Sequence, residues 1–166
     1  MKRTLATILL AGTAAAPAAA EQRDFHDYPA PLRAIMDEMR QSCTTTGGDP
    51  EFVPDAIFSM DASRDGIPDY FLSAQGFYCY RPGQRDAGGG FMENAYCTRQ
   101  NCMNWLVVSQ PRGRFRLAWS GRAFNAMPFE AGEVLGQTQQ HCRMRSCELR
   151  LVWNGTTLVP DRRRRR

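Results

Sequence analysis

The sequence predicts an α+β fold in which an N-terminal amphipathic helix packs on an antiparallel β-sheet of short strands, stapled by disulfides. Three observations lead to this prediction. Apolar residues near the N-terminus recur with helical spacing, short strand-like runs follow from residue 51, and six cysteines lie beyond residue 20. A chain of 166 residues is long enough for one domain with its own core.

The first twenty residues are typical of a secretory signal peptide. Lys2 and Arg3 form a positive start, an apolar run begins at Leu5, and three alanines at 18–20 provide a small-residue cleavage site. The run is too short and alanine-rich for the alternative, a membrane anchor, and no later segment reaches transmembrane length. We therefore expect a periplasmic or secreted protein with a signal peptide (1–20), a lead-in segment (21–29), one α+β domain (30–160) and a basic disordered tail (161–166).

All the cysteines belong to the exported part: Cys43, Cys79, Cys97, Cys102, Cys142 and Cys147. An even number in an exported chain favours disulfides over catalytic thiols. Two pairs, Cys97/Cys102 and Cys142/Cys147, share the spacing Cys-x4-Cys. Such short loops close at low entropic cost. We therefore predict bridges within these two pairs, which leaves Cys43–Cys79 to tie the helix to the sheet. A zinc site is disfavoured, because zinc knuckles favour a shorter cysteine spacing and His141 is the one imidazole nearby.

The helix is predicted over residues 31–42. Leu32, Ile35, Met36 and Met39 make one apolar stripe, and Pro31 suits the first turn. A polar stretch at 44–50 follows. The predicted strands lie at residues 56–60, 70–73, 77–80, 101–109, 114–119, near 133–136, 148–153 and 156–159, with a type I′ turn at Asn154-Gly155 and a flexible glycine loop at 81–90.

The stretch from residue 61 to residue 69 has the spacing of a calcium-binding loop, with oxygen-bearing side chains at loop positions 1, 3, 5 and 9. Gly66, at position 6, allows the sharp turn that such loops need. The predicted Ca²⁺ ligands are Asp61, Ser63, Asp65, the backbone carbonyl of Ile67, and Asp69. A bound ion would be structural, relieving carboxylate repulsion before a strand.

This loop departs from the usual pattern in three ways. Ser63 is a weaker ligand than aspartate, and Leu72 at position 12 lacks the carboxylate that an EF-hand requires, so an EF-hand is excluded. The cation of Arg64 could also replace the metal by pairing with an aspartate. The alternative, a metal-free turn in which Gly66 serves backbone geometry alone, therefore stays open.

The loop resembles the DxDxDGxxD calcium loops of FG-GAP/VCBS-type repeats, thrombospondin type 3 and dockerin modules, over nine to twelve residues. More broadly, the chain is similar to small exported bacterial proteins of unknown function. These combine a short N-terminal helix, a DGxPDY loop, cysteine-closed loops and a final strand ending in W-[ND]-G, here residues 65–70, the two cysteine pairs and residues 153–155. The resemblance implies an exported module and transfers no known activity.

Charge and catalytic composition exclude several functions. The part after residue 20 carries 19 arginines, no lysine and 17 acids, and five of those arginines form the tail at 162–166. The body therefore lacks the basic face of a nucleic-acid binder. The tail could contact anionic surfaces, or serve as a solubilising end. The only histidines are His26 and His141, and no serine-hydrolase elbow is present, so we expect a non-enzymatic protein.

Aromatic residues suggest where a ligand would bind. Tyr78, Tyr80, Phe91 and Tyr96 surround the glycine loop and could form a platform for a carbohydrate or a peptide, although cross-strand or core pairs are the alternative. The three tryptophans are expected in the core. The sequence thus predicts a monomeric, exported binding or structural module, Ca²⁺-stabilised, for an unknown protein or glycan partner. The alternative is a secreted or periplasmic inhibitor of a lysozyme or protease, acting through a rigid loop.

Overall fold

The computed structural model describes residues 24–84, 94–99, 101–130, 132–138 and 147–161. One α-helix, α1 (Ala30–Thr45), precedes nine strands in this part of the chain. The strands are β1 (Asp49–Phe52), β2 (Ile57–Met60), β3 (Asp69–Ser73), β4 (Phe77–Tyr80), β5 (Cys102–Gln110), β6 (Arg114–Pro128), β7 (Glu133–Thr138), β8 (Cys147–Trp153) and β9 (Leu158–Pro160). A short 3-10 turn, η1 (Phe25–Asp27), precedes α1, and three more lie between strands: η2 (Pro54–Ala56), η3 (Ala74–Gly76) and η4 (Pro111–Gly113).

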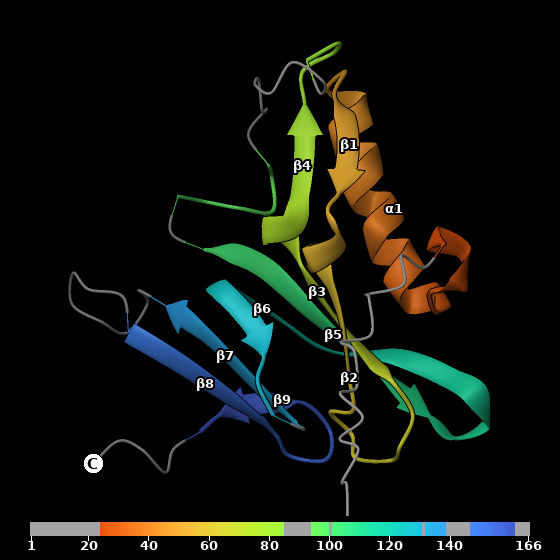
Figure 1. Cartoon of the computed structure of the whole chain (residues 1–166), viewed down its shortest axis with the longest axis vertical. Coiled ribbons are helices and arrows are strands. Elements are labelled where there is room, and N and C mark those ends of the chain that lie inside the picture. The colour runs from red at the N-terminus through yellow and green to blue at the C-terminus, as the bar shows by residue number, and fades with distance from the viewer. Residues whose placement is uncertain (1–23, 85–93, 100, 131, 139–146, 162–166) are drawn as a thin grey trace, which may run out of the picture.

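The strands form two antiparallel sheets. The larger sheet has the order β2-β3-β5-β6-β7-β8-β9, and β1 pairs with β4 in a small second sheet. Helix α1 lies beside β1 and β4 at the upper end of the molecule, while β6 to β9 form its lower part (Figure 1). The predicted α+β class, with a helix against an antiparallel sheet, is confirmed. The predicted signal peptide and residues 162–166 of the tail lie outside the described residues.

Helix α1 covers one face of the central strands. It buries Leu32, Met36, Met39 and Cys43, which recur at helical spacing and join Tyr70, Leu72, Trp105 and Val107 of the sheet in one core cluster. The helix extends three residues beyond its predicted end, since the hydroxyls of Thr44 and Thr45 donate to the carbonyl of Gln41 and hold the last turn.

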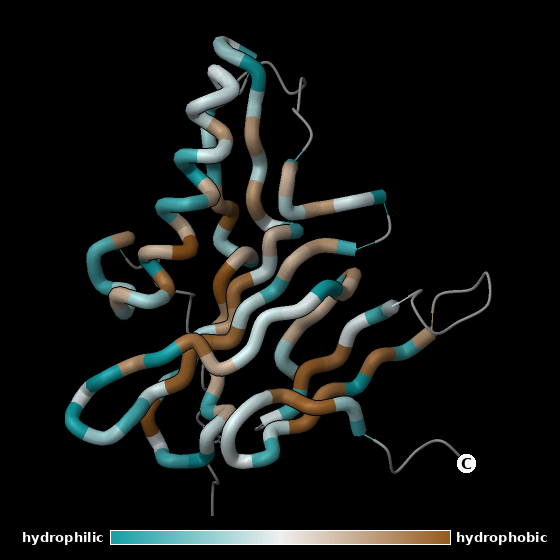
Figure 2. Tube along the Cα trace, turned by 180° about the vertical axis from the view of Figure 1, so that it is seen from behind, coloured by the Kyte–Doolittle hydropathy of each residue, from teal (hydrophilic) through white to brown (hydrophobic). Residues whose placement is uncertain are grey.

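Strands β3 and β5 are buried on both faces. Tyr70 and Leu72 point to the α1 side, while Phe71 joins a second core cluster with Leu106 and Val134, which the strands β6 to β9 enclose. Every residue of β3 is buried. Hydrophobic residues accordingly follow the central strands, whereas the tip of the β5–β6 hairpin is hydrophilic (Figure 2). Trp105 is buried, and Trp119 and Trp153 pack against the second cluster, as predicted for the core.

Strand β6 corrects the expectation of uniformly short strands, because it runs for 15 residues. Its first part pairs with β5 and its last part with β7, and the register shifts between Phe124 and Met127. Asn125 has a φ of +48°, so the chain bends here and changes partner. One long strand therefore pairs with both β5 and β7. The alternating pattern at residues 114–119 predicts only the first part of this strand.

Two further local predictions are wrong. Residues 49–50, predicted as part of a polar connection, begin β1, which Phe52 anchors by packing on Phe77 with ring centroids 4.8 Å apart. The last hairpin has no type I′ turn: only Gly155 of the two central residues has positive φ, and Trp153 pairs with Leu158. The Asn154 side chain instead accepts hydrogen bonds from the backbone N–H groups of Thr156 and Thr157 and closes a longer loop.

Two predicted disulfides are confirmed. Cys43–Cys79 joins α1 to β4 across 36 residues, and Cys97–Cys102 closes a short loop before β5. Cys147 is also disulfide-bonded, while its predicted partner Cys142 lies outside the described residues.

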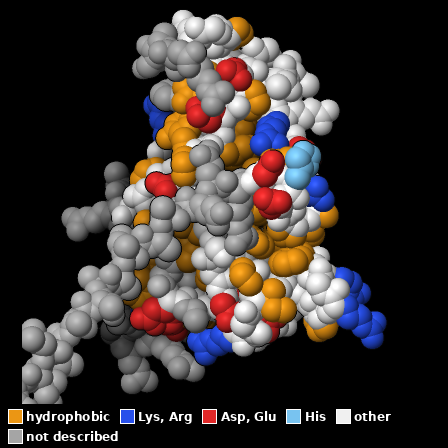
Figure 3. All heavy atoms as spheres, turned by 45° about the vertical axis from the view of Figure 1, so that its right-hand side comes forward, with side chains coloured by type: hydrophobic (Ala, Val, Ile, Leu, Met, Phe, Trp, Pro, Cys, Tyr) orange, Lys and Arg blue, Asp and Glu red, His pale blue; other side chains and the backbone are white. Residues whose placement is uncertain are grey.

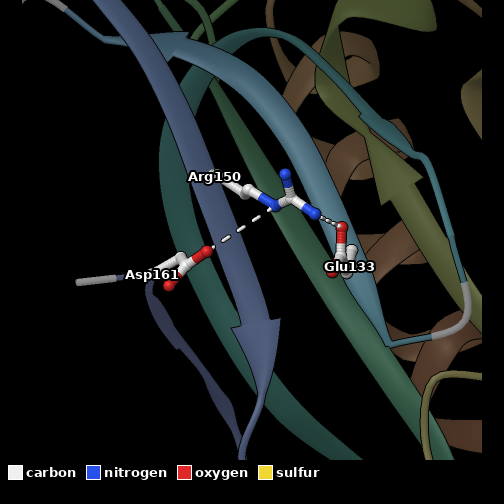
Figure 4. Close-up of polar contacts among 3 residues, drawn as sticks. All are labelled: Glu133, Arg150 and Asp161. Atoms are coloured by element: carbon white, nitrogen blue, oxygen red, sulfur yellow. Dashed lines mark hydrogen bonds and ion pairs between the residues drawn. The ribbon is translucent and has the colours of Figure 1, made fainter. Parts of the chain in front are cut away.

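An arginine on the outer face joins the last three strands (Figure 4). Arg150 of β8 donates through Nη2 to Glu133 of β7, and its Nε lies 3.8 Å from a carboxylate oxygen of Asp161, just beyond β9. The backbone N–H of Asp161 also donates to the carbonyl of Arg150. These half-buried charges hold the end of the described chain against the sheet.

Candidate functional site

The Asp61 loop, residues 61–68, connects β2 to β3. Two residues with positive φ, Arg64 at +61° and Gly66 at +80°, turn the chain. The carboxylate of Asp61 accepts hydrogen bonds from the backbone N–H groups of Asp65 and Gly66, at 3.1 and 3.2 Å. The first predicted ligand thus organises the turn by binding backbone donors of its own loop.

The next two aspartates attach this loop to β5. Asp69 is fully buried and accepts from the N–H groups of Ser63 (2.8 Å) and Ser109 (2.7 Å). Asp65 accepts from the hydroxyl of Ser109 at 2.8 Å and from the N–H of Ile67 at 2.9 Å. Ser109 therefore joins both carboxylates, and sequence reasoning did not single it out, because it is 40 residues away from Asp69.

These hydrogen bonds favour the charged form of Asp65. They lower the pKa of its carboxyl below the ordinary value of 3.8, first through the N–H of Ile67 and then through the hydroxyl of Ser109. The side chain of Ile67 is exposed. The predicted role of this residue as a Ca²⁺ ligand involves only its backbone carbonyl.

The fit of this loop to Ca²⁺ is mixed. Both oxygens of each of the three carboxylates already accept from protein donors, and no three His, Cys, Asp or Glu side chains in the described ranges are grouped to hold a metal. The hydroxyl of Ser63, however, is buried without a described hydrogen-bond partner. Calcium binding by the predicted ligands therefore stays a prediction.

A groove lies at the other end of β2. This β2 groove has a volume of about 490 Å³. Its described lining consists of Val53, Asp55, Phe58, Ser73, Gln75, Gly76, Tyr78, Asn125, Ala126 and Met127. Met127 is half exposed, and it also lines a smaller hollow of about 330 Å³ against β7 and β8.

The groove wall is held by a pair of amide side chains. Gln75 of η3 donates through Nε2 to the side-chain oxygen of Asn125 at 2.8 Å, and its own oxygen accepts from the backbone N–H of Asn125 at 3.0 Å. This clamp fixes the bend of β6 at its positive-φ residue. Below it, Gly76 lets η3 approach η2, because a Cβ there would stand 2.6 Å from Cα of Ala56. The groove is therefore held in shape by the protein itself.

The predicted aromatic platform is only partly assembled. Tyr78 lines the groove, and the centroid of its ring lies 6.1 Å from that of Tyr80. Tyr96 instead packs on Trp105, and its hydroxyl donates to Glu38 at 3.4 Å. Burial, and then the charge of Glu38, raises the pKa of Tyr96. Phe91 lies outside the described residues.

Sequence reasoning missed Gln75, Asn125 and Met127 as groove residues. Each is an ordinary residue in a segment without a motif, and they meet only where the bent part of β6 packs against η3. Of the two histidines, His26 is exposed in η1, and His141 lies outside the described residues.

Charge is distributed unevenly over the surface. Arg112 and Arg114 are exposed at the β5–β6 hairpin, whereas Asp55 is the one charged residue in the described lining of the β2 groove. On the face that Figure 3 shows, basic side chains project at the lower right, with hydrophobic patches beside them. The groove and the hairpin are thus chemically distinct surfaces.

No family model matches the sequence, and no curated protein or solved structure matches the chain closely enough to carry a comparison.

Proposed function

We propose that the protein is an exported, non-enzymatic binding module that holds its partner at the β2 groove. The observation that carries this proposal is the groove itself, which combines a half-exposed methionine, two aromatic side chains and a clamped amide pair. Ligand sites are commonly apolar hollows with a few fixed polar groups. Since the groove is preformed, binding would require little ordering of the protein.

Export is part of this proposal. Disulfides persist in oxidising compartments, and the signal-like N-terminus supplies a route to one. No helix in the described ranges is long and apolar enough to cross a membrane. A fusion of residues 1–30 to a reporter enzyme that is active only in the periplasm should give activity. Retention of the full-length, uncleaved protein in the cytoplasm would contradict export.

A matched pair of variants tests the groove. Met127→Lys places a charge in it, whereas Leu117→Lys places one at a similarly exposed site elsewhere on β6, since the two side chains are 50% and 47% exposed. The oxidised protein is screened against immobilised glycans, peptides and cell-envelope proteins, and against substrates of common hydrolases. We expect binding that Met127→Lys abolishes and Leu117→Lys preserves. Turnover of a substrate, or equal binding by both variants, would contradict the proposal.

A second function is favoured by the loop that Cys97–Cys102 closes. Thr98 and Arg99 are exposed there, and the N–H of Thr98 donates to the carbonyl of Asn101 at 2.8 Å. A rigid, exposed loop loses little entropy on binding, as an inhibitor requires. An arginine would suit a serine protease with an acidic specificity pocket. Inhibition of a trypsin-like protease that Arg99→Ala removes would support this function, and an uninhibited panel of proteases and lysozymes would contradict it.

A further inference from the structure

Three of the four outer strand edges in the described sheets are covered or shortened. Strand β1 lies along α1, and the side chain of Asn94 donates to the carbonyl of Phe77, the first residue of β4. Strand β9 has three residues and ends at Pro160, which has no N–H to donate. Such devices prevent unwanted pairing at a sheet edge.

The fourth edge, on the four-residue strand β2, has no covering element among the residues that the structure describes. Ile57–Met60 pairs only with β3 within the described part of the chain, and the strand contains no proline, charged residue or bulge. In an antiparallel pair, about half of the N–H and C=O groups of an outer strand point away from its neighbour. Their hydrogen-bonding complement is the backbone of another extended strand.

The β2 groove adjoins this edge. Phe58 of β2 lines the groove, while the next residue, Ser59, is exposed. A strand laid along β2 would present alternate side chains to the groove, as in other proteins that bind peptides by strand addition. The apolar walls at Phe58 and Met127 would receive an apolar side chain.

The charge of the site selects among such segments. Asp55, two residues before β2, is exposed, and among the described lining residues it is the one ionisable side chain apart from Tyr78. An arginine or lysine in the bound segment would be attracted to this carboxylate, and an acidic segment would be repelled.

We propose that β2 binds an extended segment of a partner polypeptide, which adds to the sheet as an eighth strand beside the seven present and places an apolar side chain in the β2 groove. The inference rests on the proposed binding function and names its partner class: a peptide strand with apolar residues at alternate positions and a basic residue near Asp55.

Synthetic peptides that alternate valine or leucine with threonine or arginine are the probes. Each is labelled and titrated against the oxidised, full-length mature chain. We expect a subset to bind, with affinity lowered about tenfold or more by Met127→Lys and unchanged by Leu117→Lys. Replacing one arginine of a binding peptide by glutamate should lower the affinity of that peptide for the wild-type protein. Circular dichroism of both variants checks that they remain folded.

Backbone methylation separates strand addition from simple groove filling. N-methyl groups placed one at a time along a binding peptide should abolish binding at alternate positions only, because alternate N–H groups face β2. Uniform tolerance of methylation would overturn the inference, and so would failure of every peptide to bind. A glycan or folded protein that binds with sensitivity to Met127→Lys, while all peptides fail, would sink this inference and leave the proposed function intact.

Discussion

Asp65 shows how one carboxylate links local turn geometry to stability. Its pKa is lowered by the N–H of Ile67 and the hydroxyl of Ser109, so the folded state favours the charged form. This stabilisation is present above the unfolded pKa, near 3.8, and is lost as the pH falls through the lower folded pKa. We predict that Asp65→Asn melts below the wild type at neutral pH.

The melting temperatures of both proteins, measured from neutral to strongly acidic pH, check this prediction. The difference between them should close once the pH has fallen below the folded pKa of Asp65. A difference that stays constant across the whole range would show that the charge of Asp65 does not matter.

A substitution of Ser63, also a single residue, tests calcium binding. Its hydroxyl is buried without a described partner, so Ser63→Ala should cost little or nothing in chelator. If the loop binds Ca²⁺, the ion raises the melting temperature of the wild type, and Ser63→Ala reduces that rise. Melting curves with calcium and with chelator make the comparison. An identical wild-type curve in both buffers would leave the loop as a turn held by protein donors.

At the scale of elements, the Gln75–Asn125 clamp holds the bend of β6. Gln75→Ala removes two hydrogen bonds and leaves a positive-φ residue without its support. We expect a loss of about 1–2 kcal/mol in the free energy of unfolding. Urea titration measures it, with Gln84→Ala, exposed in the β4–β5 connection, as the control. Equal stability of the two variants would show that β6 bends without the clamp.

The disulfides join elements over different lengths of chain. Cys43–Cys79 spans 36 residues and Cys97–Cys102 spans 5, so the chain-entropy model gives about 4 kcal/mol for the first and about 2 kcal/mol for the second. Replacing each pair by serines should therefore cost more for the bridge between α1 and β4. Urea unfolding of the two double variants checks the order. A larger loss for the short bridge would contradict this account of the staples.

At the scale of the whole molecule, local patterns predicted most elements. Helical spacing located α1, a continuous apolar run located the strand around Trp105, and alternation located the strand around Leu151. The length of β6 was not predictable, since its second half turns at Asn125 and depends on Gln75, 50 residues away. β1 was missed because Asp49-Pro50 is a poor strand sequence that pairs only once β4 is in place.

The Asp61 loop and the β2 groove also differ in whether the sequence could predict them. The Asp61 loop was found because its spacing lies within nine residues, although its attachment to Ser109 depends on the sheet. The β2 groove was not found, because its walls come from η2, β2, β3, η3, β4 and β6. Only the packing of these distant segments creates it.

The central claim is that a strand edge beside the groove is open for a partner. Amide hydrogen exchange of the free, oxidised protein, resolved by residue, tests this most directly. We expect about half of the amides in Ile57–Met60 to exchange quickly, while those of β3 and β5 are strongly protected. Protection of every β2 amide to the level of β3 would mean that the edge is already covered, and would contradict the proposed docking of a partner strand.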